Sequence, residues 1–113
     1  MLTIDALKAF GANTDDALTR CMGNEAFYFR MIGKVVEDPN FDLLEEAVSA
    51  GNLDKAFEAA HTLKGALGNL SLTPIYDPVA EITELLRANR KIDYSPYLKT
   101  ITEKKNELME LMK

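Results

Sequence analysis

The chain has few of the residues on which metal, redox and disulfide chemistry depends. Its 113 residues include one histidine, His61, one cysteine, Cys21, and no tryptophan. A single cysteine excludes an internal disulfide and two-cysteine redox motifs, and a single histidine excludes any metal site that needs two. We therefore expect no metal ion on this chain. Cys21 falls in an apolar pattern, and we interpret it as a core residue.

Long apolar runs and a basic excess are also missing. No segment approaches the roughly 18 apolar residues that span a bilayer, and residues 1–5 lack the basic and apolar regions of a signal peptide. The 13 Lys and Arg residues are outnumbered by 18 Asp and Glu, and the net charge of −5 repels nucleic acid. We expect no membrane association, no nucleic-acid partner, and the cytoplasm as the default compartment.

The remaining composition is that of a globular protein. Hydrophobic residues make up 47% and charged residues 27% of the chain, which is too apolar for intrinsic disorder. A chain of this length can bury one hydrophobic core. We expect a single domain over residues 1–113 that acts as a monomer.

Apolar residues recur at spacings of three and four almost throughout, which predicts an all-α fold. Two short helices are expected first, over residues 4–10 with Thr3 as cap, and from Asn13 or Thr14 to Met22. Longer helices are then predicted from Asn24 to Asp38-Pro39, over residues 41–50, from the Asn52 cap to Leu70, from the Thr73 cap to Arg90 and from the Ser95 cap to Met112. Their short connections favour an antiparallel up-and-down four-helix bundle with the short N-terminal helices added.

Two segments leave alternatives open. Pro78 lies inside the pattern that starts at Thr73, so that helix either begins at Asp77 or has a kinked first turn. The segment over residues 27–32 has too many apolar residues for one helix stripe. It forms either a wide core face or a hydrophobic docking patch beside His61.

The segment around the only histidine reads Ala60-His61-Thr62-Leu63-Lys64-Gly65-Ala66-Leu67-Gly68-Asn69. A glycine inside a helix lowers its stability by about 1 kcal/mol relative to alanine, so the presence of both Gly65 and Gly68 in this predicted helix requires an explanation. At about 100° per residue, His61 falls on the flank of the apolar stripe, near Lys64 and both glycines. Bare backbone there permits close approach by another protein, although both glycines also suit close helix packing.

This layout suits an anion carried on histidine. An exposed imidazole is mostly neutral near neutral pH, so a ring nitrogen keeps a lone pair that can attack phosphorus. A phosphoryl group on His61 adds negative charge, and Lys64 one turn away would offset it by about 0.5–1 kcal/mol. We predict His61 as phosphoacceptor, Lys64 as the group that stabilises the phosphoryl, and Gly65 and Gly68 as a surface for partner docking.

These residues resemble the histidine-containing phosphotransfer (HPt) domain of bacterial two-component phosphorelays. The histidine, lysine at plus three, glycine at plus four, small residue at plus seven and asparagine at plus eight all match that pattern. The likeness extends to the segments Asn24-Glu25-Ala26-Phe27-Tyr28, Gly51-Asn52 and Leu85-Leu86-Arg87. One departure is Ser71, where the family often has glycine, and it leaves the end of the histidine helix open.

The resemblance implies a phosphoryl shuttle. Such a domain accepts the group from the aspartyl phosphate of a response-regulator receiver domain and passes it to another receiver, within a pathway that includes a hybrid sensor histidine kinase. The receiver supplies Mg²⁺, so this chain needs no cofactor. No Gly-rich nucleotide loop is present, and we expect neither kinase nor ATPase activity.

Two other functions compete with the shuttle. The first is a non-catalytic helical adaptor, a pseudo-HPt protein that binds a receiver or kinase without phosphotransfer. The matching set of Lys64, Gly65 and Gly68 argues against it, because an adaptor needs no histidine that can be phosphorylated. The second is a hydrolase with His61 as base, which lacks a nucleophile motif such as G-x-S-x-G.

Overall fold

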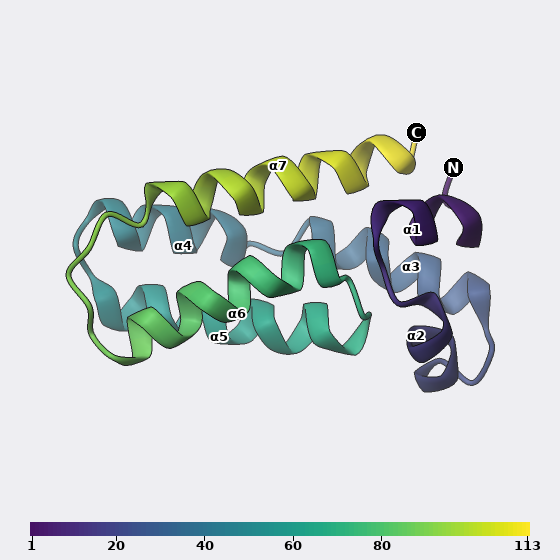
Figure 1. Ribbon diagram of the computed structural model, residues 1–113, viewed down its shortest axis with the longest axis horizontal. Coiled ribbons are helices and arrows are strands. Elements are labelled where there is room, and N and C mark those ends of the chain that lie inside the picture. The colour runs from purple at the N-terminus through teal and green to yellow at the C-terminus, as the bar shows by residue number, and fades with distance from the viewer.

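The computed structural model describes all 113 residues as seven helices without a strand. The all-α prediction is confirmed, and no helix has the length and apolarity needed to cross a membrane. The helices in chain order are α1 (Ile4–Phe10), α2 (Thr14–Arg20), α3 (Glu25–Val36), α4 (Asn40–Ser49), α5 (Leu53–Asn69), α6 (Thr73–Arg87) and α7 (Ser95–Leu111) (Figure 1).

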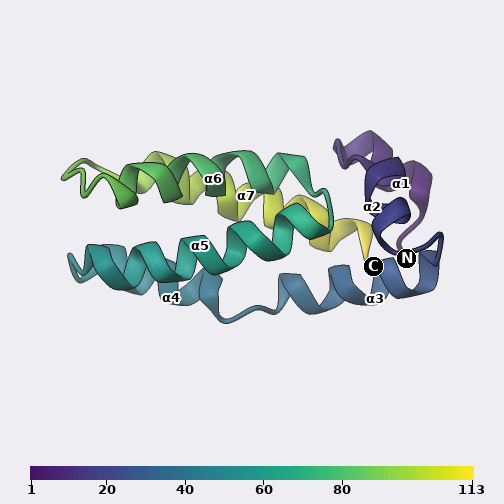
Figure 2. The same ribbon diagram turned by 90° about the horizontal axis from the view of Figure 1, so that it is seen from below.

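The bundle has four columns, one of which is made by α3 and α4 end to end. Figure 2 shows these two helices following one another along one side, with α5 beside α4. Pro39 separates them, because a residue before proline is pushed out of the helical region. The Asp38 carboxylate then accepts hydrogen bonds from the backbone and side-chain amides of Asn40, at 2.8 and 2.9 Å, and so begins α4. Helices α5, α6 and α7 alternate in direction, which confirms the antiparallel bundle.

A single core of 24 buried hydrophobic residues runs through the bundle. The stripe predicted for α5 forms part of it, since Ala60, Leu63 and Leu67 are fully buried. The Asn52 side chain caps this helix as predicted, accepting a hydrogen bond from the Lys55 amide at 3.1 Å. The buried stripe fixes the rotation of α5, and residues on its flank, His61 among them, are left at the surface.

The two short helices form a layer across one end of the bundle, beside the turn that joins α5 to α6 (Figures 1 and 2). We call residues 1–24 the N-terminal layer. Gly11 ends α1 at φ +113°, and a Cβ on it would lie 2.9 Å from Pro74 Cγ, so the layer packs closely on the start of α6. The Asn13 amide donates to the Ser71 carbonyl at 3.0 Å. Cys21 is half-buried against the core.

Several predicted helix ends are wrong. Helix α6 begins at Thr73 and continues through Pro78, so the alternative start at Asp77 is excluded. It ends at Arg87 rather than Arg90, because Asn89 adopts a left-handed φ of +57° that breaks the helical path.

The caps before the two proline-led helices also shift by one residue. Thr73 and Ser95, predicted as caps, are the first helical residues of α6 and α7. The cap positions belong to Leu72 and Tyr94, whose side chains make no capping hydrogen bond. At the start of α7 the Asp93 carboxylate instead accepts a hydrogen bond from the Ser95 amide at 2.9 Å.

Candidate functional site

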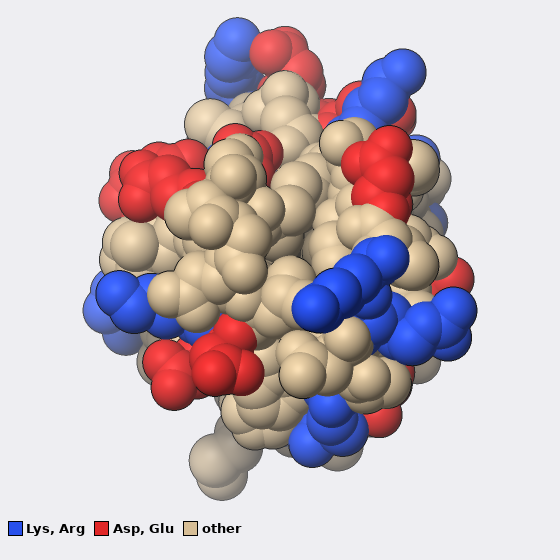
Figure 3. Space-filling view, turned by 90° about the vertical axis from the view of Figure 1, so that its left-hand side faces the viewer, with Lys and Arg blue, Asp and Glu red and all other residues tan.

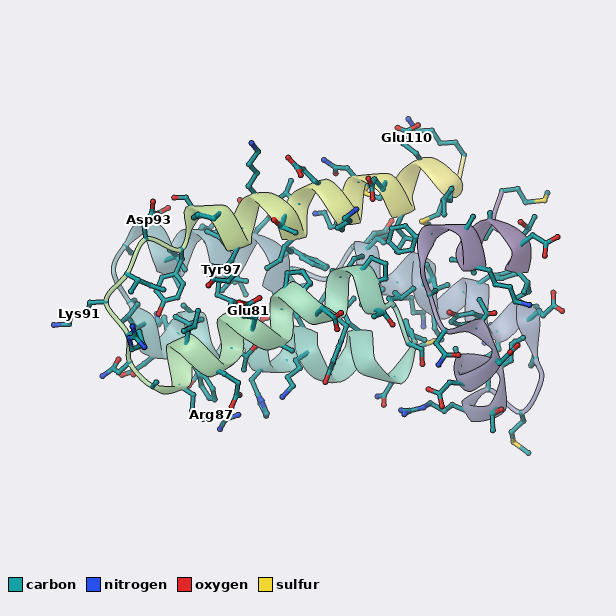
Figure 4. The ribbon with its side chains drawn as sticks, in the orientation of Figure 1. Glu81, Arg87, Lys91, Asp93, Tyr97 and Glu110 are labelled. Atoms are coloured by element: carbon teal, nitrogen blue, oxygen red, sulfur yellow. The ribbon has the colours of Figure 1, made fainter.

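His61 lies in the middle of α5 with its side chain exposed. Its imidazole stacks on the ring of Phe57, one helical turn earlier, with ring centroids 5.6 Å apart and an interplanar angle of 13°. The Arg87 guanidinium lies 5.0 Å from the centroid of the same phenyl ring and pairs with Glu84 at 3.2 Å. Figure 4 shows Arg87 near the C-terminal end of α6. Phe57 therefore restrains the orientation of the imidazole from one side.

A surface groove of about 550 Å³ includes His61, and we call it the His61 groove. All four residues predicted for the site lie along it. Its wall also includes residues from α2, from the turn after α5 and from the start of α6. The lining consists of Asn13, Asp16, Arg20, His61, Lys64, Gly65, Gly68, Asn69, Ser71, Thr73 and Tyr76.

The two glycines of α5 have different surroundings. A Cβ added to Gly65 would meet no atom within 4 Å, so the backbone here is bare and open to the groove. A Cβ added to Gly68 would lie 3.2 Å from Cε2 of Tyr76, so the absence of a side chain there lets α6 pack closely. Close packing between helices thus explains why residue 68 is a glycine. No contact within the molecule explains why residue 65 is one.

Lys64 lies one turn beyond His61 and is half-buried at the groove. None of the five ion pairs in the structure involves it. Lys64 and Arg20 are the cations of the lining and Asp16 is its only acidic residue. The lining thus holds two cations and one carboxylate, on a chain with a net charge of −5.

Four polar side chains join the far end of the groove to the N-terminal layer. The Ser71 hydroxyl donates to Asp16 Oδ2 at 2.6 Å, and Arg20 Nε lies 3.2 Å from the same oxygen. Arg20 Nη1 also donates to Asn69 Oδ1 at 3.5 Å. We call Asp16, Arg20, Asn69 and Ser71 the polar cluster. It fixes α2 against the end of α5.

Ser71, the departure from the family pattern, adopts a left-handed φ of +51°. Glycine reaches this conformation without strain, whereas a residue with a Cβ is strained by roughly 1–2 kcal/mol. The hydrogen bond to Asp16 offsets that strain, because a bond to a charged acceptor contributes about 1.5–3 kcal/mol. The helix ends at Asn69, just before this turn.

The segment over residues 27–32 packs mainly into the core. Tyr28 and Ile32 are fully buried, and no residue of the segment lines the His61 groove. The Tyr28 hydroxyl donates to the Leu70 carbonyl at 2.9 Å, which secures the turn after α5. Burial, with the nearby Cys21 as the second cause, raises the pKa of Tyr28 to about 12. The structure thus favours the interpretation as a core face.

Several residues near His61 or along its groove carry no local signal in the sequence. Phe57 fits the apolar stripe, and only its spacing of four from His61 hints at the ring stack. Asp16 and Arg20 form a common i,i+4 ion pair on a short helix. Their place beside α5 depends on the turn at Ser71. No three His, Cys, Asp or Glu side chains lie close enough together to hold a metal ion.

Comparison with known proteins places the chain in one family. The family model described as the Hpt domain matches residues 38–111, well over half of the chain. That range includes His61 and the α5, α6 and α7 columns, and it excludes the N-terminal layer. No curated protein and no solved structure matches the chain.

Proposed function

The chain belongs to the Hpt domain family, and we propose that it carries the phosphoryl group of a phosphorelay on His61. Hpt domains act in phosphotransfer and interact with receiver domains. One observation supports the assignment to this residue above all. The only histidine of the chain is exposed on a groove of the matched segment, beside the free cation Lys64 and the bare backbone of Gly65.

The proposed reaction moves one phosphoryl group between an aspartate and His61. A neutral ring nitrogen donates its lone pair to phosphorus, and the bond from phosphorus to the receiver's aspartate oxygen breaks. The electron pair of that bond stays on the aspartate, which leaves as a carboxylate. Transfer to a second receiver is the same step in reverse, with a new aspartate oxygen as nucleophile.

Each neighbour of His61 has a role in this proposal. Phe57 holds the imidazole plane, so less orientational freedom is lost when the ring meets phosphorus. The Lys64 ammonium offsets charge on the transferred group. Gly65 lets the receiver approach the α5 backbone, and Gly68 contributes indirectly through close packing with Tyr76. The receiver supplies Mg²⁺, and this chain supplies the nucleophile without a cofactor.

The test is incubation with a receiver domain phosphorylated on its aspartate, followed by intact-mass measurement. The protein is expected to gain one phosphoryl group, and His61→Gln is expected to gain none. Because His61 is the only histidine, a label that is labile in acid and stable in alkali identifies phosphohistidine and its position together. Phosphoramidate, a small-molecule phosphodonor, provides a second assay that needs no receiver.

The outcomes separate the shuttle from the adaptor. Equal labelling of wild type and His61→Gln would overturn the assignment of His61. Receiver binding without any label on wild type, in the presence of Mg²⁺, would favour the pseudo-HPt adaptor. Circular dichroism of His61→Gln is the control for folding. Because the His61 side chain is exposed, the helical signal of the variant should be unchanged.

A further inference from the structure

The His61 groove extends beyond the part of the chain that the Hpt family model matches. Asn13, Asp16 and Arg20 all line it, and all precede residue 38, where the match begins. The groove thus combines α5 with His61, inside the matched segment, and a wall from α2 outside it. Selectivity among similar receivers requires contacts besides those to the reacting histidine.

Arg20 is the residue of that wall best prepared to bind an anion. Its Nε pairs with Asp16 and its Nη1 donates to Asn69, while half of the side chain, 52%, remains exposed. A guanidinium has five N–H donors in a planar fork, and these two contacts leave three at its terminal nitrogens. Two such donors match the two oxygens of a carboxylate.

The polar cluster also limits the motion of Arg20. Asp16 is held by the Ser71 hydroxyl at 2.6 Å, so the oxygen that Arg20 pairs with is itself fixed to the turn after α5. A long side chain restrained before binding loses less conformational entropy when a partner arrives. Arg20 is therefore a positioned cation at the end of the groove.

We propose that Arg20 binds a carboxylate on the surface of the receiver domain and thereby selects which receiver docks over His61. The inference rests on the proposed function, because it requires a receiver in the groove. Charge complementarity supports an acidic partner surface, since Arg20 and Lys64 outnumber Asp16 along the groove of an acidic chain. Arg20 is hydrogen-bonded to Asn69, which lies two turns beyond His61 on α5. Arg20 therefore contacts the receiver's surface and not the phosphoryl group.

The test compares charge reversal at Arg20 with the same reversal far from the groove. Lys91 is the control, because it is exposed and lies at the end of the molecule opposite α2 (Figure 4). Both basic and acidic side chains are spread over that end (Figure 3). The probe is the phosphorylated receiver domain that labels wild-type His61 fastest.

Arg20→Glu is expected to slow transfer at subsaturating receiver by about tenfold or more relative to Lys91→Glu, with little change at saturation. Arg20→Lys should retain part of the rate, since it keeps charge without the fork. Arg20→Gln, which creates no repulsion with Asp16, should slow transfer less than Arg20→Glu. The rate of transfer should depend less on salt concentration in Arg20→Gln and in Arg20→Glu than in wild type.

Labelling by phosphoramidate separates docking from damage to the site. All variants are expected to react with phosphoramidate within about twofold of wild type, because Arg20 does not act on phosphorus. Equal slowing by Arg20→Glu and Lys91→Glu would overturn the inference while leaving the shuttle intact. The same conclusion would follow if Arg20→Glu slowed transfer only at saturating receiver. Absence of any label on wild type from a receiver would instead overturn the proposed function.

Discussion

The bundle and the N-terminal layer share one hydrophobic core but differ in how each adjoins the His61 groove, which lies where they meet. Within the bundle, α5 buries Leu63 and Leu67 completely, so burial of apolar area fixes its position. The layer buries Leu7 and Ala17, but its junction with α5 depends on directional hydrogen bonds at Ser71. The nucleophile therefore stands on the rigid part of the fold, while the wall opposite it depends on a few polar contacts.

The largest effect is expected from removing apolar volume under His61. Leu63→Ala deletes a fully buried side chain two residues from His61, and such changes cost about 2–5 kcal/mol. The matched control is Thr62→Ala, between the two, where the side chain is exposed and the change should stay within about 0.5 kcal/mol. Urea unfolding followed by circular dichroism measures both. A loss below about 1 kcal/mol for Leu63→Ala would contradict the view that this column carries the stability.

The second effect is a loss of stability in alkali through Tyr28. Because its folded-state pKa is about 12 and the ordinary value is 10.0, the folded state favours the protonated phenol. The contribution is complete below pH 10 and is lost as pH rises toward 12, by about 2–3 kcal/mol. Tyr28→Phe loses the bond to Leu70 but has no phenol to ionise, so its stability should fall less over this range. Parallel pH profiles for the two proteins would exclude Tyr28 as the cause.

A smaller effect distinguishes strain from hydrogen bonding at Ser71. Ser71→Ala keeps the left-handed strain and removes the bond to Asp16, so we expect a loss of about 1.5–2 kcal/mol, the low end for a charged acceptor because the Asp16 side chain is half-exposed. Ser71→Gly removes the bond and the strain together and should be more stable than the alanine variant by about 1 kcal/mol. Urea midpoints of the two variants give the comparison. If the alanine variant were the more stable one, the backbone at residue 71 would not be strained.

Ser71 also shows where prediction from the sequence stops. Spacing alone placed α5, its Asn52 cap and the shared flank of His61 and Lys64, because these depend on contacts within one helix. The wall formed by Asp16 and Arg20 depends on how the turn at Ser71 orients distant segments, and no local pattern encodes it. The same holds for Gly68, whose role became clear only from its contact with Tyr76 on another helix.

The smallest effect separates the two glycines. Gly65→Ala places a methyl group in open space, so helix propensity should stabilise the protein by about 0.5–1 kcal/mol. In Gly68→Ala the methyl group would lie 3.2 Å from Tyr76, and the required shift should cancel that gain. Gly65→Ala should also slow labelling by a receiver while phosphoramidate labelling is unchanged, because only a docking protein meets the new methyl group. Unchanged transfer from the receiver would mean that the partner does not approach α5 at Gly65.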